Sequence, residues 1–92
     1  KAVASGQCDK GIVCCGTGIG VSITANKEKG IRCALCTNEF MAEMAKRHNN
    51  ANMLAFGARI TPVEDVLKMV DIWLNAAFEE GRHQRRIDLI EM

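Results

Sequence analysis

The chain has 92 residues, which is enough for one domain and too short for two. Its 12 basic and 11 acidic side chains leave a formal charge of +1, which argues against a nucleic-acid binder that depends on bulk charge. Apolar residues make up 48% of the chain, so we expect a packed core and not intrinsic disorder. No apolar run approaches about 18 residues and no leader sequence is visible, so we expect neither a membrane span nor a signal peptide.

Residues 1–7 are predicted to be the tail of a helix that ends at Gly6, which suggests that further sequence precedes the chain. Residues 12–15 form a short apolar run without alternation, which is typical of a parallel strand covered on both faces. Helical spacing resumes after a glycine-rich turn and continues through Lys27, and Gly30 is the expected stop.

Residues 31–36 are predicted to form a second strand, and Thr37 or Asn38 is placed to cap the helix that follows. The apolar face of that helix is expected to comprise Phe40, Met41, Met44 and Ala45. A third apolar run covers residues 53–56 and is closed by Gly57.

The next helix has a clear start signal, with Thr61 as the expected cap, Pro62 in the first helical position and Glu64 bonding back to the Thr61 amide. Its apolar residues repeat at three- and four-residue steps through residue 78, and a last helical segment follows over residues 82–90. Alternating strands and helices predict a single α/β domain over residues 1–92, with a Rossmann-like parallel sheet and flanking helices. Three strands make a thin sheet, which a further N-terminal strand and helix would complete. Without them we expect one sheet edge or helix face to be uncovered, which favours association.

The five cysteines are odd in number and irregular in spacing, which does not suit a secreted disulfide framework and favours a reducing cytoplasm. Cys33 and Cys36 have the spacing of a metal or redox pair, but positions three apart on a strand point to opposite faces. We therefore favour a core role for them and keep metal or redox chemistry as the alternative. A redox switch between Cys14 and Cys15 is disfavoured because adjacent strand residues also face opposite ways.

The strongest local feature is the glycine-rich turn that follows Cys15 at a strand-to-helix junction. It comprises Gly16, Thr17, Gly18, Ile19 and Gly20. Glycines let backbone amides approach an anion, and the following helix N-terminus adds positive charge. The same position lowers the pKa of a thiol, so Cys15 is a candidate nucleophile or general base. The alternatives are a purely structural turn and a core thiol.

Basic and imidazole side chains supply the rest of the candidate site. His48 and Asn49 follow a predicted helix end, where a histidine can instead serve the last carbonyl groups. Arg82 and Arg86 share a helix face and can bind a phosphate. The alternative is a solvated charged face on which they pair with Glu79, Glu80 or Asp88. With Arg59 they suggest proton transfer on a small phosphorylated substrate, with the cysteine, histidine and arginines near one edge of the sheet.

Three separated motifs resemble the ribose-5-phosphate isomerase type B family, which includes galactose-6-phosphate isomerase. They are Cys15–Gly20 with Ala25–Lys27, His48–Asn49 with Asn52–Arg59, and Gly81–Arg86. The resemblance implies interconversion of an aldose phosphate and a ketose phosphate through an enediolate, without metal or cofactor, in the pentose phosphate pathway. It also implies a homodimer or homotetramer whose sites are shared between subunits, with no nucleic-acid or membrane partner.

The resemblance also implies a role for each candidate residue. The position matching Cys15 moves the proton, the loop from Gly16 to Gly20 with the Thr17 hydroxyl holds the oxyanion, and His48 assists ring opening. Asn49 would bind substrate hydroxyls, and Arg59, Arg82 and Arg86 would bind the phosphate. The family's first strand and its Asp-His pair have no match here, so we expect residues 1–92 alone to be inactive or very weak. A six-carbon sugar-phosphate isomerase and a non-catalytic sugar-phosphate-binding module remain the alternatives.

Overall fold

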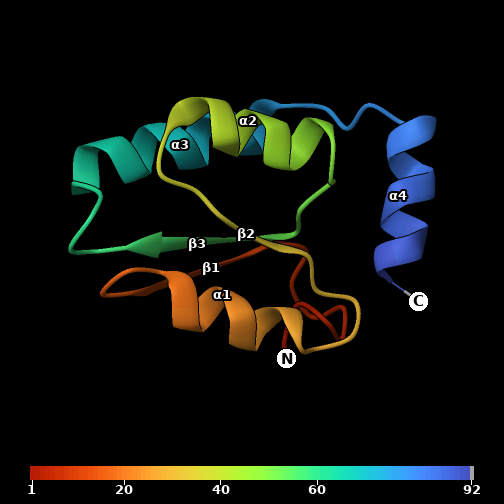
Figure 1. The fold of residues 1–92 in the computed structure, drawn as a ribbon, viewed down its shortest axis with the longest axis horizontal. Coiled ribbons are helices and arrows are strands. Elements are labelled where there is room, and N and C mark those ends of the chain that lie inside the picture. The colour runs from red at the N-terminus through yellow and green to blue at the C-terminus, as the bar shows by residue number, and fades with distance from the viewer. Residues whose placement is uncertain (92) are drawn as a thin grey trace.

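A three-stranded parallel sheet lies at the centre of the computed structural model, which describes residues 1–91 (Figure 1). The strands are β1 (Gly11–Cys15), β2 (Cys33–Leu35) and β3 (Met53–Gly57), in the spatial order β1-β3-β2. The central strand, β3, pairs in parallel with both neighbours. This confirms the predicted α/β class with a parallel sheet, and the strands lie within two residues of their predicted bounds.

Four helices flank the sheet: α1 (Ile19–Asn26), α2 (Glu39–Arg47), α3 (Val63–Asn75) and α4 (Arg82–Ile90). Helix α1 contacts all three strands from one face, while α2 and α3 pack against each other over the opposite face (Figure 1). Helix α4 stands beside the end of the sheet at which β3 begins (Figure 1). Within residues 1–91, no helix is both long enough and apolar enough to cross a membrane.

The main core lies between β3 and the helix pair α2 and α3. Its largest fully buried side chains are Trp73, Phe56, Leu54, Met69 and Cys36. The Trp73 indole N–H also donates to the Ala51 carbonyl oxygen at 3.1 Å, so the polar atom of this buried ring is satisfied. This core fixes β3, and with it the loops at both ends of the central strand.

Strand β1 is less covered than the sequence predicts. Its residues alternate between half-buried and exposed, with Ile12 50% exposed and Cys14 also exposed. The prediction of burial on both faces is wrong for this chain, because β1 is an edge strand of the sheet and its neighbours cover only alternate side chains.

Two predicted helix features also differ from the structure. Residues 1–7 form turns and not a helix, with the Ser5 amide donating to the Lys1 carbonyl at 2.9 Å before Gly6 takes a positive φ of 86°. Helix α3 begins without the predicted capping box, since no side chain caps it and Thr61 is buried. The Thr61 amide instead donates to the Gly57 carbonyl oxygen at 2.9 Å, within the loop that leads to α3.

Helix α2 has the predicted cap but a different buried face. The Asn38 side chain accepts a hydrogen bond from the Met41 amide at 2.9 Å, as expected of an N-cap. The buried residues are Ala42 and Ala45, whereas Phe40 is 69% exposed. The close approach of α2 to α3 requires small side chains in the contact, which explains why alanines occupy it.

Two asparagines from the family-like motifs hold strand ends in place. The Asn26 side chain bonds both backbone groups of Cys33, accepting from its amide at 2.7 Å and donating to its carbonyl at 2.9 Å. The Asn52 side chain accepts from the Arg32 amide at 2.9 Å and donates to the Gly30 carbonyl at 2.8 Å. Both asparagines therefore satisfy backbone groups beside β2 that the sheet leaves unpaired.

Candidate active site

Cys15 ends β1 at the carboxyl edge of the sheet, with its thiol facing the backbone of the following turn. The Gly18 amide donates to the Cys15 sulfur at 3.2 Å. This amide is the largest cause of a lowered pKa for the Cys15 thiol, and the amides of Val21, Thr17 and Gly20 act in the same direction. The turn therefore stabilises the thiolate relative to that of an ordinary cysteine, and the thiolate is the form that acts as a base or nucleophile.

The turn reaches this geometry through its glycines. Gly18 has a φ of +83°, in the left-handed region, and is buried against β3. A Cβ on Gly57 would lie 2.5 Å from the Thr17 carbonyl carbon, so the turn crosses the end of β3 at a distance that only glycine permits. The close contacts of Gly18 with Phe56 and of Gly57 with Thr17 hold the turn in the conformation in which the Gly18 amide points to the Cys15 sulfur.

The other members of the turn are open to solvent. The Thr17 side chain is exposed, and its hydroxyl oxygen accepts from the Ile19 amide at 3.3 Å, which leaves its proton free to be donated. Gly20 is exposed at the start of α1, with nothing within 4 Å of the place of a Cβ. Gly16 is half-buried. The amides of Thr17, Gly18 and Gly20 thus act on the sulfur at a helix N-terminus, where an oxyanion is stabilised.

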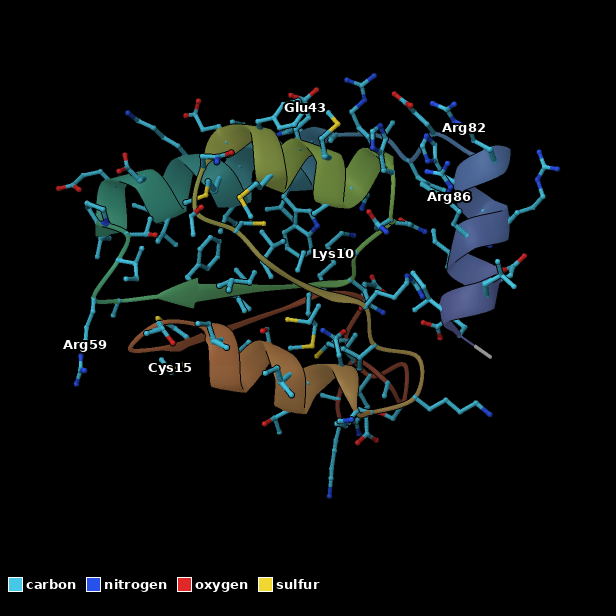
Figure 2. All side chains as sticks on the ribbon, viewed as in Figure 1. Lys10, Cys15, Glu43, Arg59, Arg82 and Arg86 are labelled. Atoms are coloured by element: carbon cyan, nitrogen blue, oxygen red, sulfur yellow. The ribbon has the colours of Figure 1, made fainter. Side chains whose placement is uncertain are left out.

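Arg59 lies at the same edge of the sheet as Cys15 (Figure 2). Backbone bonds bring it there, since the Ala58 amide donates to the Cys15 carbonyl at 2.7 Å and the Arg59 amide to the Gly16 carbonyl at 2.9 Å. The Arg59 guanidinium Nε lies 3.4 Å from where a Cβ of Gly16 would be, and no ion pair within residues 1–91 involves Arg59. It is a cation available to an anionic ligand beside the thiol.

Arg82 and Arg86 lie at the opposite end of the molecule from Cys15 and Arg59 (Figure 2). Both are exposed on α4, and neither takes part in an ion pair within residues 1–91. None of the expected carboxylate partners pairs with them: the Glu79 carboxylate accepts from Arg47, that of Asp88 accepts from Gln84, and Glu80 forms no ion pair within residues 1–91. The two guanidiniums therefore remain available for a phosphate.

His48 and Asn49 follow the last residue of α2, at the amino edge of the sheet. The prediction that cysteine, histidine and arginines gather near one sheet edge is therefore wrong within a single chain. A crossover helix runs antiparallel to the strands it joins, so its C-terminus lies where the strands begin. Cys15 and Arg59 form one group at the carboxyl edge, and His48, Asn49, Arg82 and Arg86 form a second group at the other end.

The remaining cysteines lack the features of Cys15. All five are free, and Cys36 lies in the core, where burial raises its pKa to about 11. Burial likewise raises the pKa of the partly buried Cys33 thiol. The structure agrees with the core interpretation of the Cys33 and Cys36 pair, because one of the two thiols is closed off from any ligand.

The profile of the family described as Ribose/Galactose Isomerase matches residues 1–90. The chain belongs to this family. The chain is 48% identical over 89 residues to ribose-5-phosphate isomerase B of Escherichia coli, which covers 97% of this chain and 60% of the relative. It is 42% identical over 87 residues to galactose-6-phosphate isomerase subunit LacB of Clostridium acetobutylicum, covering 95% of this chain and 50% of the relative.

Solved structures of the family have the same fold. Ribose-5-phosphate isomerase B of Clostridium thermocellum superposes with a TM-score of 0.96 at 54% identity, covering 98% of this chain and 61% of that one. The enzyme of Mycoplasma genitalium with bound ribulose 5-phosphate superposes with a TM-score of 0.92 at 46% identity, covering 97% of this chain and 59% of that one. The chain thus spans about 60% of the length of these family members.

Proposed function

We propose that this chain is part of an aldose–ketose isomerase that interconverts ribose 5-phosphate and ribulose 5-phosphate, with Cys15 as the base. The observation that carries the proposal is the hydrogen bond that the Gly18 amide donates to the Cys15 sulfur at 3.2 Å, in a turn that lowers the pKa of this thiol. Mere binding of a sugar phosphate needs no such base. Membership in a family of isomerases gives this thiol its substrate class.

The chemistry follows from the groups around the sulfur. The Cys15 thiolate removes the proton from C2 of the open-chain aldose, and the electron pair forms a C1–C2 double bond while the C1 carbonyl oxygen becomes an oxyanion. Amides of the turn and the Thr17 hydroxyl stabilise that oxyanion. Transfer of the O2 proton to O1 moves the negative charge to O2, and return of the proton from Cys15 to C1, as the C2 carbonyl forms, gives the ketose. No metal or cofactor is required.

The rest of the site is supplied by a second copy of the chain. Cys15 and Arg86 lie at opposite ends of a molecule whose longest dimension is 34 Å, far beyond the length of a pentose phosphate (Figure 2). In a homodimer, or a homotetramer built from such dimers, the end of one copy that carries His48, Asn49, Arg82 and Arg86 faces the Cys15 edge of the other. His48 then assists ring opening, Asn49 binds substrate hydroxyls, and Arg82 and Arg86 hold the phosphate together with Arg59.

Residues 1–92 form a partial domain in this proposal, and alone they have little or no activity. Five free thiols suit a reducing cytoplasm, and interconversion of the two pentose phosphates belongs to the pentose phosphate pathway.

The test uses the full-length protein that the gene encodes, and it compares alanine variants of two adjacent cysteines. Cys15→Ala should lower kcat for ribose 5-phosphate by at least about 100-fold, because it removes the base, and should leave the affinity for a phosphate-bearing substrate analogue nearly unchanged. Cys14→Ala is the matched control, since Cys14 is exposed and one residue away. Equal turnover by the two variants would remove Cys15 from its role and favour a non-catalytic binding module.

A six-carbon sugar phosphate is the second candidate substrate, favoured by the 42% identity to the galactose-6-phosphate isomerase subunit. The ratio of kcat/KM for ribose 5-phosphate to that for galactose 6-phosphate decides between them. A ratio well above one supports the pentose, and a ratio below one supports the hexose.

A further inference from the structure

Two histidines and a glutamate meet where the end of α2 faces the segment before α4. The rings of His48 and His83 stack with their centroids 4.2 Å apart and their planes 12° from parallel. The Glu79 carboxylate oxygen Oε1 lies 3.9 Å from Nε2 of His48 and 3.8 Å from Nε2 of His83. His83 is buried, whereas two-fifths of the His48 side chain is exposed. Only one of the stacked rings therefore reaches solvent.

The Glu79 carboxylate is held from both sides. The Arg47 guanidinium pairs with its other oxygen, Oε2, and also bonds Glu43 at 2.8 Å. The Glu79 backbone amide donates to the Arg47 carbonyl at 2.8 Å. These bonds connect helix α2 to Glu79, the residue that faces both imidazoles. The position of His48 at the end of α2 therefore depends on a contact between residues that are 32 positions apart in the sequence.

A metal site is the first alternative for such a cluster, because all three ligand atoms lie within 4.8 Å of one another. The stacking argues against it. The lone pair of an imidazole nitrogen lies in the plane of its ring, so two nearly parallel rings present nearly parallel lone pairs. Two histidine ligands of one ion must instead converge on a point about 2 Å from each nitrogen.

We propose that Glu79 and His83 are positioning residues for His48 in the opening of the sugar ring. This inference rests on the proposed isomerase function. In ring opening the anomeric hydroxyl loses a proton, the C1 carbonyl forms, the bond from C1 to the ring oxygen breaks, and that oxygen gains a proton. One imidazole can perform both transfers if its ring is held at a fixed angle. Stacking on the buried His83 restricts the plane of His48, and the Glu79 carboxylate 3.9 Å from Nε2 favours the ring orientation that turns this nitrogen toward it.

The charges around the cluster fit this arrangement. Burial lowers the pKa of His83, and the nearby His48, Arg82 and Arg86 lower it further, while Glu79 opposes them. Hydrogen bonding from Arg47 lowers the pKa of Glu79. These shifts favour the neutral form of His83 and the ionised form of Glu79, so they favour a negative charge beside His48 over a second imidazolium. The charged groups that face the cluster are Glu43 and Arg47 from α2, Glu79, and Arg82 and Arg86 from α4.

The test separates ring opening from proton transfer by a choice of substrate. Ribose 5-phosphate exists mainly as a closed ring, whereas ribulose 5-phosphate has no free C5 hydroxyl and stays open. For the gene-encoded protein, Glu79→Gln and His83→Ala should each lower turnover of ribose 5-phosphate by about 100-fold. Solvent deuterium exchange at C1 of ribulose 5-phosphate should stay near the rate of the unaltered protein.

Glu79→Gln is the variant expected to preserve the fold, because Glu79 is partly exposed and glutamine has the same shape. It therefore keeps the test valid if His83→Ala does not fold. Glu80→Gln is the matched control, as Glu80 is exposed and forms no ion pair within residues 1–91.

Equal losses in both reactions, or no loss in either, would overturn the positioning role. The Cys15→Ala variant distinguishes this result from a failure of the proposed function. If Cys15 is not the base, this variant still exchanges deuterium at C1 of ribulose 5-phosphate at the rate of the unaltered protein.

Discussion

Gly18→Ala tests whether the turn after Cys15 depends on a glycine backbone. An added Cβ would lie 2.5 Å from Leu35 Cδ1 and 2.9 Å from the Phe56 carbonyl carbon, and the latter atom belongs to the central strand and cannot move aside. The left-handed φ of +83° costs about 1–2 kcal/mol for a residue with a side chain. Overpacking adds about 1–3 kcal/mol. We expect the free energy of unfolding to fall by about 2–5 kcal/mol.

The same variant should change the chemistry of Cys15. Displacement of the Gly18 amide removes the largest cause of the lowered thiol pKa, so the pH midpoint for alkylation of Cys15 should rise. Urea denaturation measures the stability, and alkylation mapped by peptide mass measures the midpoint. Gly20→Ala is the control, since it has open space around the added carbon and should be neutral or stabilising by up to about 1 kcal/mol. If the two variants behave alike in both assays, the reasoning about the turn is wrong.

Three further outcomes are expected. Trp73→Ala should lower the free energy of unfolding by about 3–5 kcal/mol in urea titrations, because it empties a fully buried site and leaves the Ala51 carbonyl unpaired; a loss below about 1 kcal/mol would contradict the core assignment. Asn38→Ala should cost about 1 kcal/mol by loss of the bond to the Met41 amide, seen as a lower urea midpoint. The lowered pKa of His83 means that the unfolded chain binds more protons below pH 6.5, so stability present above that pH should decline as the pH falls. His83→Gln should flatten this part of the pH–stability curve, and an unchanged curve would contradict the burial of His83.

The sequence was sufficient for the features that depend on local chemistry. Short apolar runs predicted all three strands, the Asn38 cap followed from its residue type, and a thiol before a glycine-rich turn marked Cys15. Each of these is determined by residues within a few positions of one another.

Features that depend on distant neighbours were missed. Helical periodicity shows which residues share a face but not what covers it, so the exposure of Phe40 and the burial of Thr61 did not follow from their spacing. The sequence suggests Glu79 as a partner for Arg82 or Arg86 on a nearby helix face, yet it bonds Arg47, which is 32 residues away. The stacked pair of His48 and His83 likewise joins two segments that no local pattern connects. The only signals in the sequence are a histidine at a helix end and another between the two arginines expected to bind phosphate.

The separation of the two groups of site residues is the point on which the functional account depends. It is tested most directly by mixing two inactive variants of the gene-encoded protein, Cys15→Ala and the double variant Arg82→Ala with Arg86→Ala. If sites are shared between copies, random exchange makes half of the dimers mixed, and each mixed dimer contains one site with both defects and one intact site. The exchanged mixture should therefore regain about one quarter of the activity of the unaltered protein. Activity no greater than the sum of the two separate variants would show that each site is built within a single chain, and would contradict the account.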